Sequence, residues 1–224
     1  MKNKVISALE AAKLVRSGDC VMVGGFLKCG TPQQVIRALL TLDTKDLTLI
    51  ANDTCFVDSG RGLLVKNGKL KKVIATHIGT NPETGRQMNE KLLEVELVPQ
   101  GTLAERIHAG GAGLGGVLTR AGIGTLVEAG KEKVTVNGVE YLLEKPLYAD
   151  VALIYGSKVD PFGNISFHGT TRNFNTIMAM AAKTVIVEAE EYLTTPMNPD
   201  EVVIAGIFVD YIVKKEEDLP HANG

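Results

Sequence analysis

Short apolar runs alternate with amphipathic segments along most of the chain. Continuous apolar runs are typical of strands buried on both faces, whereas apolar positions three or four residues apart are typical of helices. Strands are predicted at 20–23, 47–51, 72–77, 95–98, 151–155 and 184–188. Helices are predicted between them at 7–16, 32–40, 82–93, 102–109 and 176–183.

This alternation predicts an α/β fold with an open, mainly parallel sheet and helices on both faces. One segment departs from it: Asn137-Gly138 lies between two β-rich runs and predicts a β-hairpin, which we expect as an excursion from the main sheet. No linker-like stretch or repeat interrupts the chain, so residues 1–224 are expected to form a single domain. The last residues, 216–224, are expected to be frayed.

Composition and charge argue against several classes of function. The 24 basic and 26 acidic residues give a net charge of −2, without the basic patch of a nucleic-acid or membrane-surface protein. No stretch approaches the ~18 apolar residues of a transmembrane helix. The three cysteines, Cys20, Cys29 and Cys55, are an odd number without Cys-x-x-Cys spacing, which fits reduced thiols. We therefore expect a cytoplasmic protein with neither nucleic acid nor membrane as a partner.

Glycine is the one unusual component, with 24 of 224 residues against a typical ~7%. A first glycine loop follows a predicted strand and precedes a predicted helix, with Thr31 expected as the N-cap and Pro32 as the first helical residue. Its residues are Gly24, Gly25, Phe26, Leu27, Lys28, Cys29 and Gly30. Free N–H groups at a helix start and the lack of side chains favour an anionic ligand close to the backbone. Thr31 stands where a P-loop needs lysine, which excludes an ATPase; a tight turn without ligand remains the alternative.

A second glycine loop at 110–116 matches the pattern G-x-G-x-x-G. The dinucleotide fingerprint requires a strand before this pattern, and here a predicted helix precedes it. A nicotinamide site is therefore not expected. A ligand-covering loop and a close-packed loop both stay open.

Polar side chains follow two of the predicted strands, namely Asn52-Asp53-Thr54 and Gln100. The carboxyl ends of parallel strands share one edge of a sheet, so these groups are expected in one crevice beside the first glycine loop. Amide side chains there would bind a carbonyl or a carboxylate without adding charge. The alternative for each is turn formation or helix capping.

No nucleophile or metal site stands out among the remaining residues. Cys29 has no histidine nearby in the sequence and is expected to be a packing thiol. The four histidines lack metal-ligand spacing, so no metal is expected. The acidic run 188–191 is expected to lie in a solvated loop, with a catalytic Glu188 as the alternative.

Seven motifs together carry a resemblance to a known family. They occupy residues 23–32, 50–54, 77–82, 98–107, 110–113, 172–175 and 178–182. Over nearly its whole length the chain resembles the A-type subunit of the family I CoA-transferases, nearest to the acetate/butyrate–acetoacetate type. The resemblance implies a ping-pong exchange in which a carboxylate attacks an acyl-CoA and the acid leaves. CoA is then held as an enzyme–glutamyl thioester until a second acid takes it. The resemblance implies coenzyme A as a substrate and no other cofactor.

The resemblance also implies a partner chain. The nucleophilic glutamate of the family lies in a Ser-Glu-Asn-Gly motif of the B-type subunit, and this sequence lacks that motif. We expect no catalytic residue in this chain, and a B-type CoA-transferase partner in an A₂B₂ heterotetramer. By the same resemblance Gly24 to Gly30 would contact CoA, with Lys28 near a phosphate, and Asn52 and Gln100 would stabilise charge on the thioester oxygen. Gly25→Val is expected to block CoA binding while the fold is retained.

Two other functions remain open at this stage. A sugar-phosphate isomerase of related architecture would need its own general base, such as Asp53 or Glu188. A non-catalytic CoA- or nucleotide-binding module would need none.

Overall fold

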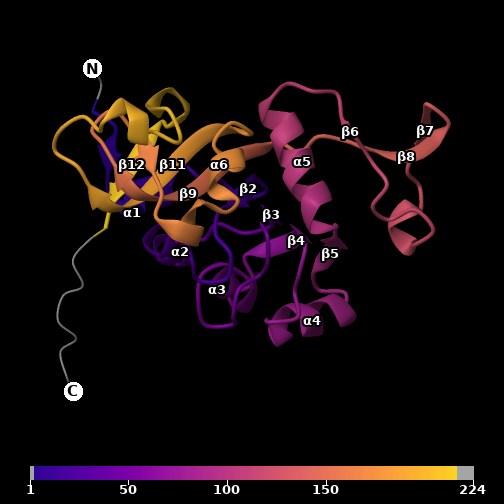
Figure 1. The fold of residues 1–224 in the computed structure, drawn as a ribbon. Helices are drawn as coiled ribbons and strands as arrows, with labels where there is room; N and C mark the ends of the chain where they lie inside the picture. Colours follow the sequence, from indigo (N-terminus) through magenta and orange to yellow (C-terminus); the bar gives the residue numbers. More distant parts are fainter. Residues whose placement is uncertain (1–2, 216–224) are drawn as a thin grey trace.

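The computed structural model describes residues 3–215, which form a nine-stranded sheet and a separate three-stranded sheet (Figure 1). The large sheet has the order β1-β12-β11-β9-β2-β3-β4-β5, with β10 added beside β9. Every pairing along that order is parallel, and only β10 is antiparallel. The predicted open, mainly parallel sheet is confirmed.

The strands and helices of this layer are short and follow one another closely. The strands are β1 (Val5–Ile6), β2 (Cys20–Val23), β3 (Leu47–Ile50), β4 (Leu70–Ala75), β5 (Glu94–Leu97), β9 (Ala149–Val159), β10 (Ile165–Ser166), β11 (Ala182–Tyr192) and β12 (Tyr211–Lys214). The helices are α1 (Ala8–Ala12), α2 (Gln33–Leu40), α3 (Arg61–Lys66), α4 (Pro82–Asn89), α5 (Gln100–Gly111) and α6 (Asn175–Met178).

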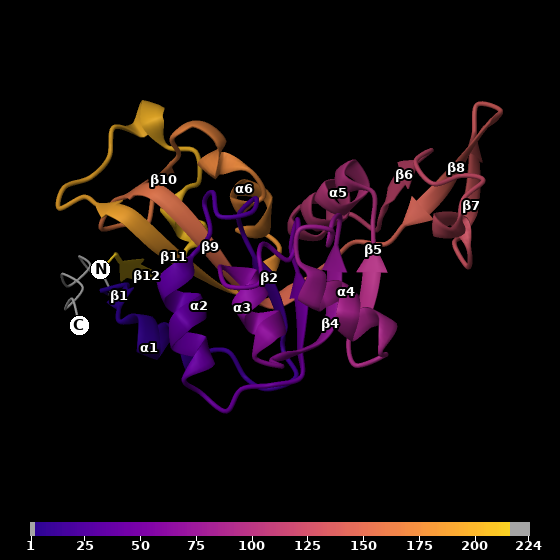
Figure 2. The same ribbon diagram turned by 90° about the horizontal axis from the view of Figure 1, so that it is seen from below.

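Apolar side chains of the strands alternate between two buried layers. In β2, Val21 and Val23 belong to the core under α1, α2 and α3, whereas Met22 belongs to the core under α5 and α6. Figures 1 and 2 show these two groups of helices on opposite faces of the sheet. Strands covered on both faces need apolar residues at successive positions, which explains the continuous runs in the sequence.

The small sheet has the order β6-β8-β7 and is antiparallel. It consists of β6 (Val117–Thr119), β7 (Lys133–Val136) and β8 (Val139–Glu144), inserted between α5 and β9, and it projects away from the large sheet (Figure 2). Asn137 and Gly138 have φ of +50° and +76°, as a two-residue hairpin turn of the type favoured between twisted strands requires. The predicted hairpin excursion is confirmed.

Several element boundaries differ from the sequence prediction. The helix predicted at 176–183 is wrong beyond Met178, because Ala182 already pairs with Ala149 at the start of the long β9–β11 ladder. Pro32, not Thr31, is the N-cap of α2; the Thr31 hydroxyl instead donates to the Leu27 carbonyl at 2.8 Å. The sequence pattern did not predict helix α3, the edge strand β1 or its neighbour β12. The tail at 216–224 lies outside the described residues.

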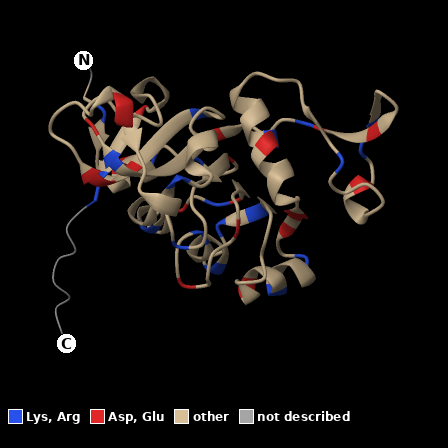
Figure 3. Ribbon diagram, viewed as in Figure 1, with Lys and Arg blue, Asp and Glu red and all other residues tan. Residues whose placement is uncertain are grey.

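Both signs of charge are spread over the large sheet, α4 and the small sheet (Figure 3). Within residues 3–215, no helix combines the length and apolar character needed to cross a membrane.

The strand order places a switch point at β2. Strands β3, β4 and β5 extend the sheet on one side of β2, whereas β9, β11 and β12 lie on the other. Open α/β sheets bind ligands in the crevice at the carboxyl ends of the strands where the order reverses. The first glycine loop follows β2 at this point.

Candidate functional site

The first glycine loop has a buried base and an exposed tip. Gly24, Gly25 and Gly30 are buried, whereas Phe26 and Lys28 are exposed. Phe26 and Cys29 exchange two backbone hydrogen bonds of 3.0 and 2.9 Å, which close residues 26–29 into a tight turn. The loop therefore presents a tip of four residues to solvent.

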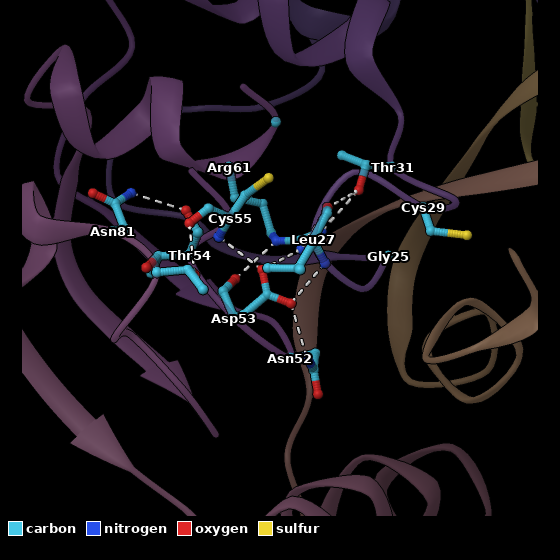
Figure 4. A network of polar contacts seen from close by, with 12 residues as sticks. Gly25, Leu27, Cys29, Thr31, Asn52, Asp53, Thr54, Cys55, Arg61 and Asn81 are labelled. Atoms are coloured by element: carbon cyan, nitrogen blue, oxygen red, sulfur yellow. Dashed lines mark hydrogen bonds and ion pairs between the residues drawn. The ribbon is translucent and has the colours of Figure 1, made fainter. Parts of the chain in front are cut away.

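A fully buried arginine, Arg61 at the start of α3, holds the base of the loop. Its guanidinium donates to the carbonyls of Gly24 at 2.6 Å and Leu27 at 3.1 Å, and to the Thr31 hydroxyl at 3.1 Å. It also forms an ion pair of 2.7 Å with Asp53 Oδ1 (Figure 4). No sequence motif marked Arg61 in advance, although this side chain ties both ends of the loop together.

Asp53 lies at the centre of this network (Figure 4). Its carboxylate accepts the backbone N–H groups of Leu27 at 2.9 Å and Cys55 at 2.7 Å, and the Asn52 amide at 2.8 Å. Burial opposes its charge, but the Arg61 guanidinium and these hydrogen bonds hold the pKa of Asp53 below its ordinary value. Asp53 is thus a carboxylate at neutral pH that accepts hydrogen bonds from all four of these groups.

Two asparagines hold the other side of the loop. Asn173 accepts the Gly25 N–H at 3.1 Å and donates to the Cys29 carbonyl at 3.2 Å. Asn175 donates to the Gly30 carbonyl at 3.0 Å and accepts the Tyr155 N–H at 2.9 Å. The connection from β9 to β11 therefore fixes the loop from the side opposite Arg61.

The loop glycines are required by internal packing. A Cβ at Gly24 would lie 1.8 Å from Asn175 Oδ1, and a Cβ at Gly25 would lie 2.2 Å from Thr31 Oγ1. Gly25 also has φ +109°, which side chains rarely adopt. A side chain at position 25 meets protein atoms, so Gly25→Val would strain the loop whether or not a ligand binds there.

Asn52 and Gln100 come together, as predicted from their positions after parallel strands. Gln100 Nε2 donates to Asn52 Oδ1 at 2.7 Å. Both line a cavity of about 360 Å³, together with Phe26, Leu27 and the polar side chains of Thr76, His77 and Thr80. Gln100 is exposed, whereas only 1% of Asn52 is. Gln100 is therefore the amide that a bound molecule can reach.

A second cavity, of about 570 Å³, lies on the other side of Phe26. Cys29, Thr170 and Arg172 line it. The Cys29 thiol lies 3.1 Å from the Thr170 hydroxyl. The side chain of Phe26 thus faces two cavities.

Glu188 is not in a solvated loop, and that prediction is wrong. It lies in β11 with 5% of its surface exposed, and accepts the N–H groups of Gln34 at 2.8 Å and Val35 at 3.1 Å. Pro32 gives α2 no capping side chain, so Glu188 caps this helix from the sheet. Burial raises the pKa of Glu188 to about 7.

The second glycine segment starts inside α5. A Cβ at Gly110 would lie 2.0 Å from the Leu147 carbonyl, and one at Gly111 would lie 2.7 Å from Met180 Cβ. For these two residues the close-packing alternative holds.

The comparison with known proteins decides the family. A model described as Coenzyme A transferase matches residues 5–215. The chain belongs to the coenzyme A transferase family. It is 53% identical over 216 residues to the acetoacetyl-CoA:acetate/butyrate CoA transferase alpha subunit of Clostridium acetobutylicum, covering 96% of this chain and 99% of the relative. It is 50% identical to the alpha subunit of acetate CoA-transferase from Escherichia coli K12, covering 97% and 99%.

Solved structures share the fold of this coenzyme A transferase chain. An acyl-CoA transferase from Escherichia coli O157:H7, solved as a thioester complex with CoA, superposes with a TM-score of 0.85 at 22% identity. The match covers 100% of this chain and 49% of that one, so the chain spans about half the length of the solved enzyme. Glutaconate coenzyme A-transferase from Acidaminococcus fermentans matches with a TM-score of 0.82 at 22% identity, covering 94% and 75%.

The two carboxylates considered as the base of an isomerase, Asp53 and Glu188, do not suit that role in this family member. Among the described residues, Asp53 is the one acidic residue lining the cavity of Asn52 and Gln100, and it is already paired with Arg61. Glu188 lines a different cavity, of about 760 Å³, with Lys28, Arg37 and Lys215. Within residues 3–215, no three His, Cys, Asp or Glu side chains gather as a metal ion would require.

Proposed function

We propose that this chain is the A-type half of a two-chain CoA-transferase, which moves CoA between a short-chain acyl-CoA or acetoacetyl-CoA and a free carboxylic acid. One observation carries the proposal: Gln100 and Asn52 form an amide pair in a small cavity whose acidic residue, Asp53, is ion-paired. Such a cavity can stabilise a carbonyl that gains negative charge, but its described residues offer no free carboxylate to attack it. The names of relatives about half identical to this chain support the same substrates.

The nucleophile in this proposal is a glutamate of the partner chain, in a Ser-Glu-Asn-Gly motif. Its carboxylate attacks the acyl-CoA carbonyl and displaces the CoA thiolate, which gives a mixed anhydride of the glutamate and the acid. The thiolate then attacks the glutamyl carbonyl of this anhydride, which releases the acid as its carboxylate and leaves CoA as a glutamyl thioester. A second acid then reverses the sequence and leaves as the new acyl-CoA. The half-length match to a longer acyl-CoA transferase chain supports a site shared between two halves.

In this proposal the chain binds CoA and stabilises the charge that develops during the transfer. The exposed Gln100 amide would donate to the thioester oxygen as charge develops there; a single such donor is worth about 10²–10³ in kcat. The loop Gly24 to Gly30 would contact CoA through its tip, with Phe26 between an acyl cavity and a cavity for the CoA arm. Lys28, which is exposed and lies 5.6 Å from the Phe56 ring centroid, would meet a CoA phosphate.

The remaining features of the proposal follow the family. Coenzyme A is a substrate, no further cofactor takes part, and residues 1–224 act as one domain in an A₂B₂ heterotetramer in the cytoplasm. The two kinds of chain would contribute complementary parts to each active site.

Reconstitution tests the proposal. The purified chain is assayed for transfer of CoA from acetoacetyl-CoA to acetate, alone and after mixing with a partner chain that carries Ser-Glu-Asn-Gly. We expect no transfer by the chain alone and transfer by the mixture. Comparable activity of the chain alone would contradict the shared site. CoA binding by the chain, with no transfer in any mixture, would instead support a binding module.

A further inference from the structure

A continuous series of hydrogen bonds links the buried ion pair to the exposed amide. Arg61 donates to Asp53 Oδ1 at 2.7 Å, and Asn52 Nδ2 donates to Asp53 Oδ2 at 2.8 Å. Gln100 Nε2 then donates to Asn52 Oδ1 at 2.7 Å. Three of these four residues are at most 1% exposed, and only Gln100 reaches solvent.

The charge of Asp53 dictates the direction of every bond in this series. An ionised carboxylate accepts hydrogen bonds and cannot donate them. Asn52 must therefore turn its NH₂ group toward Asp53, which leaves its carbonyl oxygen for Gln100. Gln100 must in turn present its NH₂ group to that oxygen. One N–H of Gln100 is used in this way, and the second stays free to donate to a bound molecule.

We infer that the Arg61–Asp53 pair fixes the amide of Gln100, through Asn52, as a hydrogen-bond donor toward the cavity. An amide side chain can exchange its oxygen and nitrogen by rotation, and nothing in Gln100 itself selects one orientation. Arg61 is needed because a buried carboxyl without a cation tends to take up a proton and could then donate.

This inference rests on the proposed transfer of CoA. In that reaction the thioester oxygen gains negative charge, which a donor stabilises and a carbonyl oxygen repels. With the amide of Gln100 reversed, its oxygen would face the charge. Asp53, Arg61 and Asn52 are therefore positioning residues that act through Gln100.

A double-mutant cycle in the reconstituted complex tests the inference. Asp53→Asn keeps the shape of the side chain but can donate, so it lets the series reverse. We expect Gln100→Ala to lower kcat about 10²–10³-fold, and Asp53→Asn to lower it about tenfold or more while KM for acetoacetyl-CoA changes less than about threefold. In the Gln100→Ala background, Asp53→Asn should lower kcat by less than about threefold further.

A matched control separates positioning from a general loss of stability. Asp160 is also fully buried, and it accepts the N–H groups of Phe162, Asn164 and Met197 away from the cavity. Asp160→Asn should lower stability in the same way and leave kcat unchanged. If the Asp53→Asn complex fails to assemble, the same double-mutant cycle is measured with Asn52→Ala, which keeps the Arg61–Asp53 ion pair.

Two results would overturn the inference. One is an Asp53→Asn or Asn52→Ala effect on kcat that is as large in the Gln100→Ala background as in the wild type. The other is a wild-type kcat in Asp53→Asn. A wild-type complex that transfers no CoA would instead refute the proposed function itself, so the two failures are distinguishable.

Discussion

The buried carboxyl of Glu188 gives the sharpest test of the energetics. Its ordinary pKa of 4.5 is raised to about 7 by burial, against the opposing effects of the Val35 and Gln34 N–H groups and of Lys215. Each pH unit corresponds to about 1.4 kcal/mol. Ionisation of Glu188 therefore costs about 3 kcal/mol more free energy in the folded chain than in the unfolded chain. Glu188→Gln carries no charge, and its carbonyl oxygen can still accept the same N–H groups.

The sign of the pH dependence follows from the raised pKa. Below pH 4.5 the Glu188 carboxyl is protonated in both the folded and the unfolded chain, so its contribution to the stability of the folded chain is fully present. As pH rises to about 7, the unfolded chain releases the proton first and the stabilisation is lost. We expect Glu188→Gln to match the wild type near pH 4.5 and to be more stable by up to about 3 kcal/mol at pH 8.

Urea denaturation between pH 4.5 and 8, at one protein concentration, measures this difference. Glu191→Gln is the control, because Glu191 lies on the same strand with 56% of its side chain exposed, and it should change the free energy of unfolding by less than about 0.5 kcal/mol. A Glu188→Gln difference that does not vary with pH would refute the reasoning. So would a variant less stable than the wild type at pH 8.

Two further predictions concern packing and acid stability. Gly25→Ala should lower the free energy of unfolding by about 1–3 kcal/mol, because its Cβ would lie 2.2 Å from Thr31 Oγ1. The control Gly101→Ala, with no atom within 4 Å of its Cβ, should not lower the free energy of unfolding. Equal melting temperatures for the two variants would contradict this prediction. Hydrogen bonds hold the pKa of Asp160 below its ordinary 3.8 although burial opposes them, so its stabilisation is present above pH 3.8 and lost as pH falls. Asp160→Asn should therefore be less stable than the wild type by about 1–3 kcal/mol at pH 7, with a smaller difference near pH 3. Urea denaturation at the two pH values measures this difference. A difference that grows at low pH would contradict the prediction.

The meeting of Asn52 and Gln100 could be predicted because it follows from a general rule. Asn52 follows β3 and Gln100 follows β5, and the carboxyl ends of parallel strands share one edge of a sheet. The 2.7 Å hydrogen bond between them confirms this. The fold class followed from equally local information, the alternation of buried strands with amphipathic helices.

Arg61 could not be found in this way. It lies between Gly60 and Gly62, and charged residues in such surroundings are nearly always exposed. Its burial depends on Asp53 and on carbonyl groups of a loop some thirty residues earlier. Only the folded chain brings these acceptors together.

Glu188 was misplaced for a related reason. The apolar run before it suggested a strand that ends at 188, whereas β11 continues to Tyr192 because β9 pairs with it that far. The same β9–β11 pairing begins at Ala182, so the last residues of the helix predicted at 176–183 belong to a strand. Pairing between strands more than twenty residues apart is not visible in a local pattern.

The central claim is that this chain supplies half of a CoA-transferase site and that its partner carries the nucleophile. The most direct measurement is the intact mass of each chain after the reconstituted complex has been incubated with acetoacetyl-CoA in the absence of an acceptor acid. A CoA adduct on the partner chain, with this chain unmodified, is the expected result. A CoA adduct on this chain would contradict the claim.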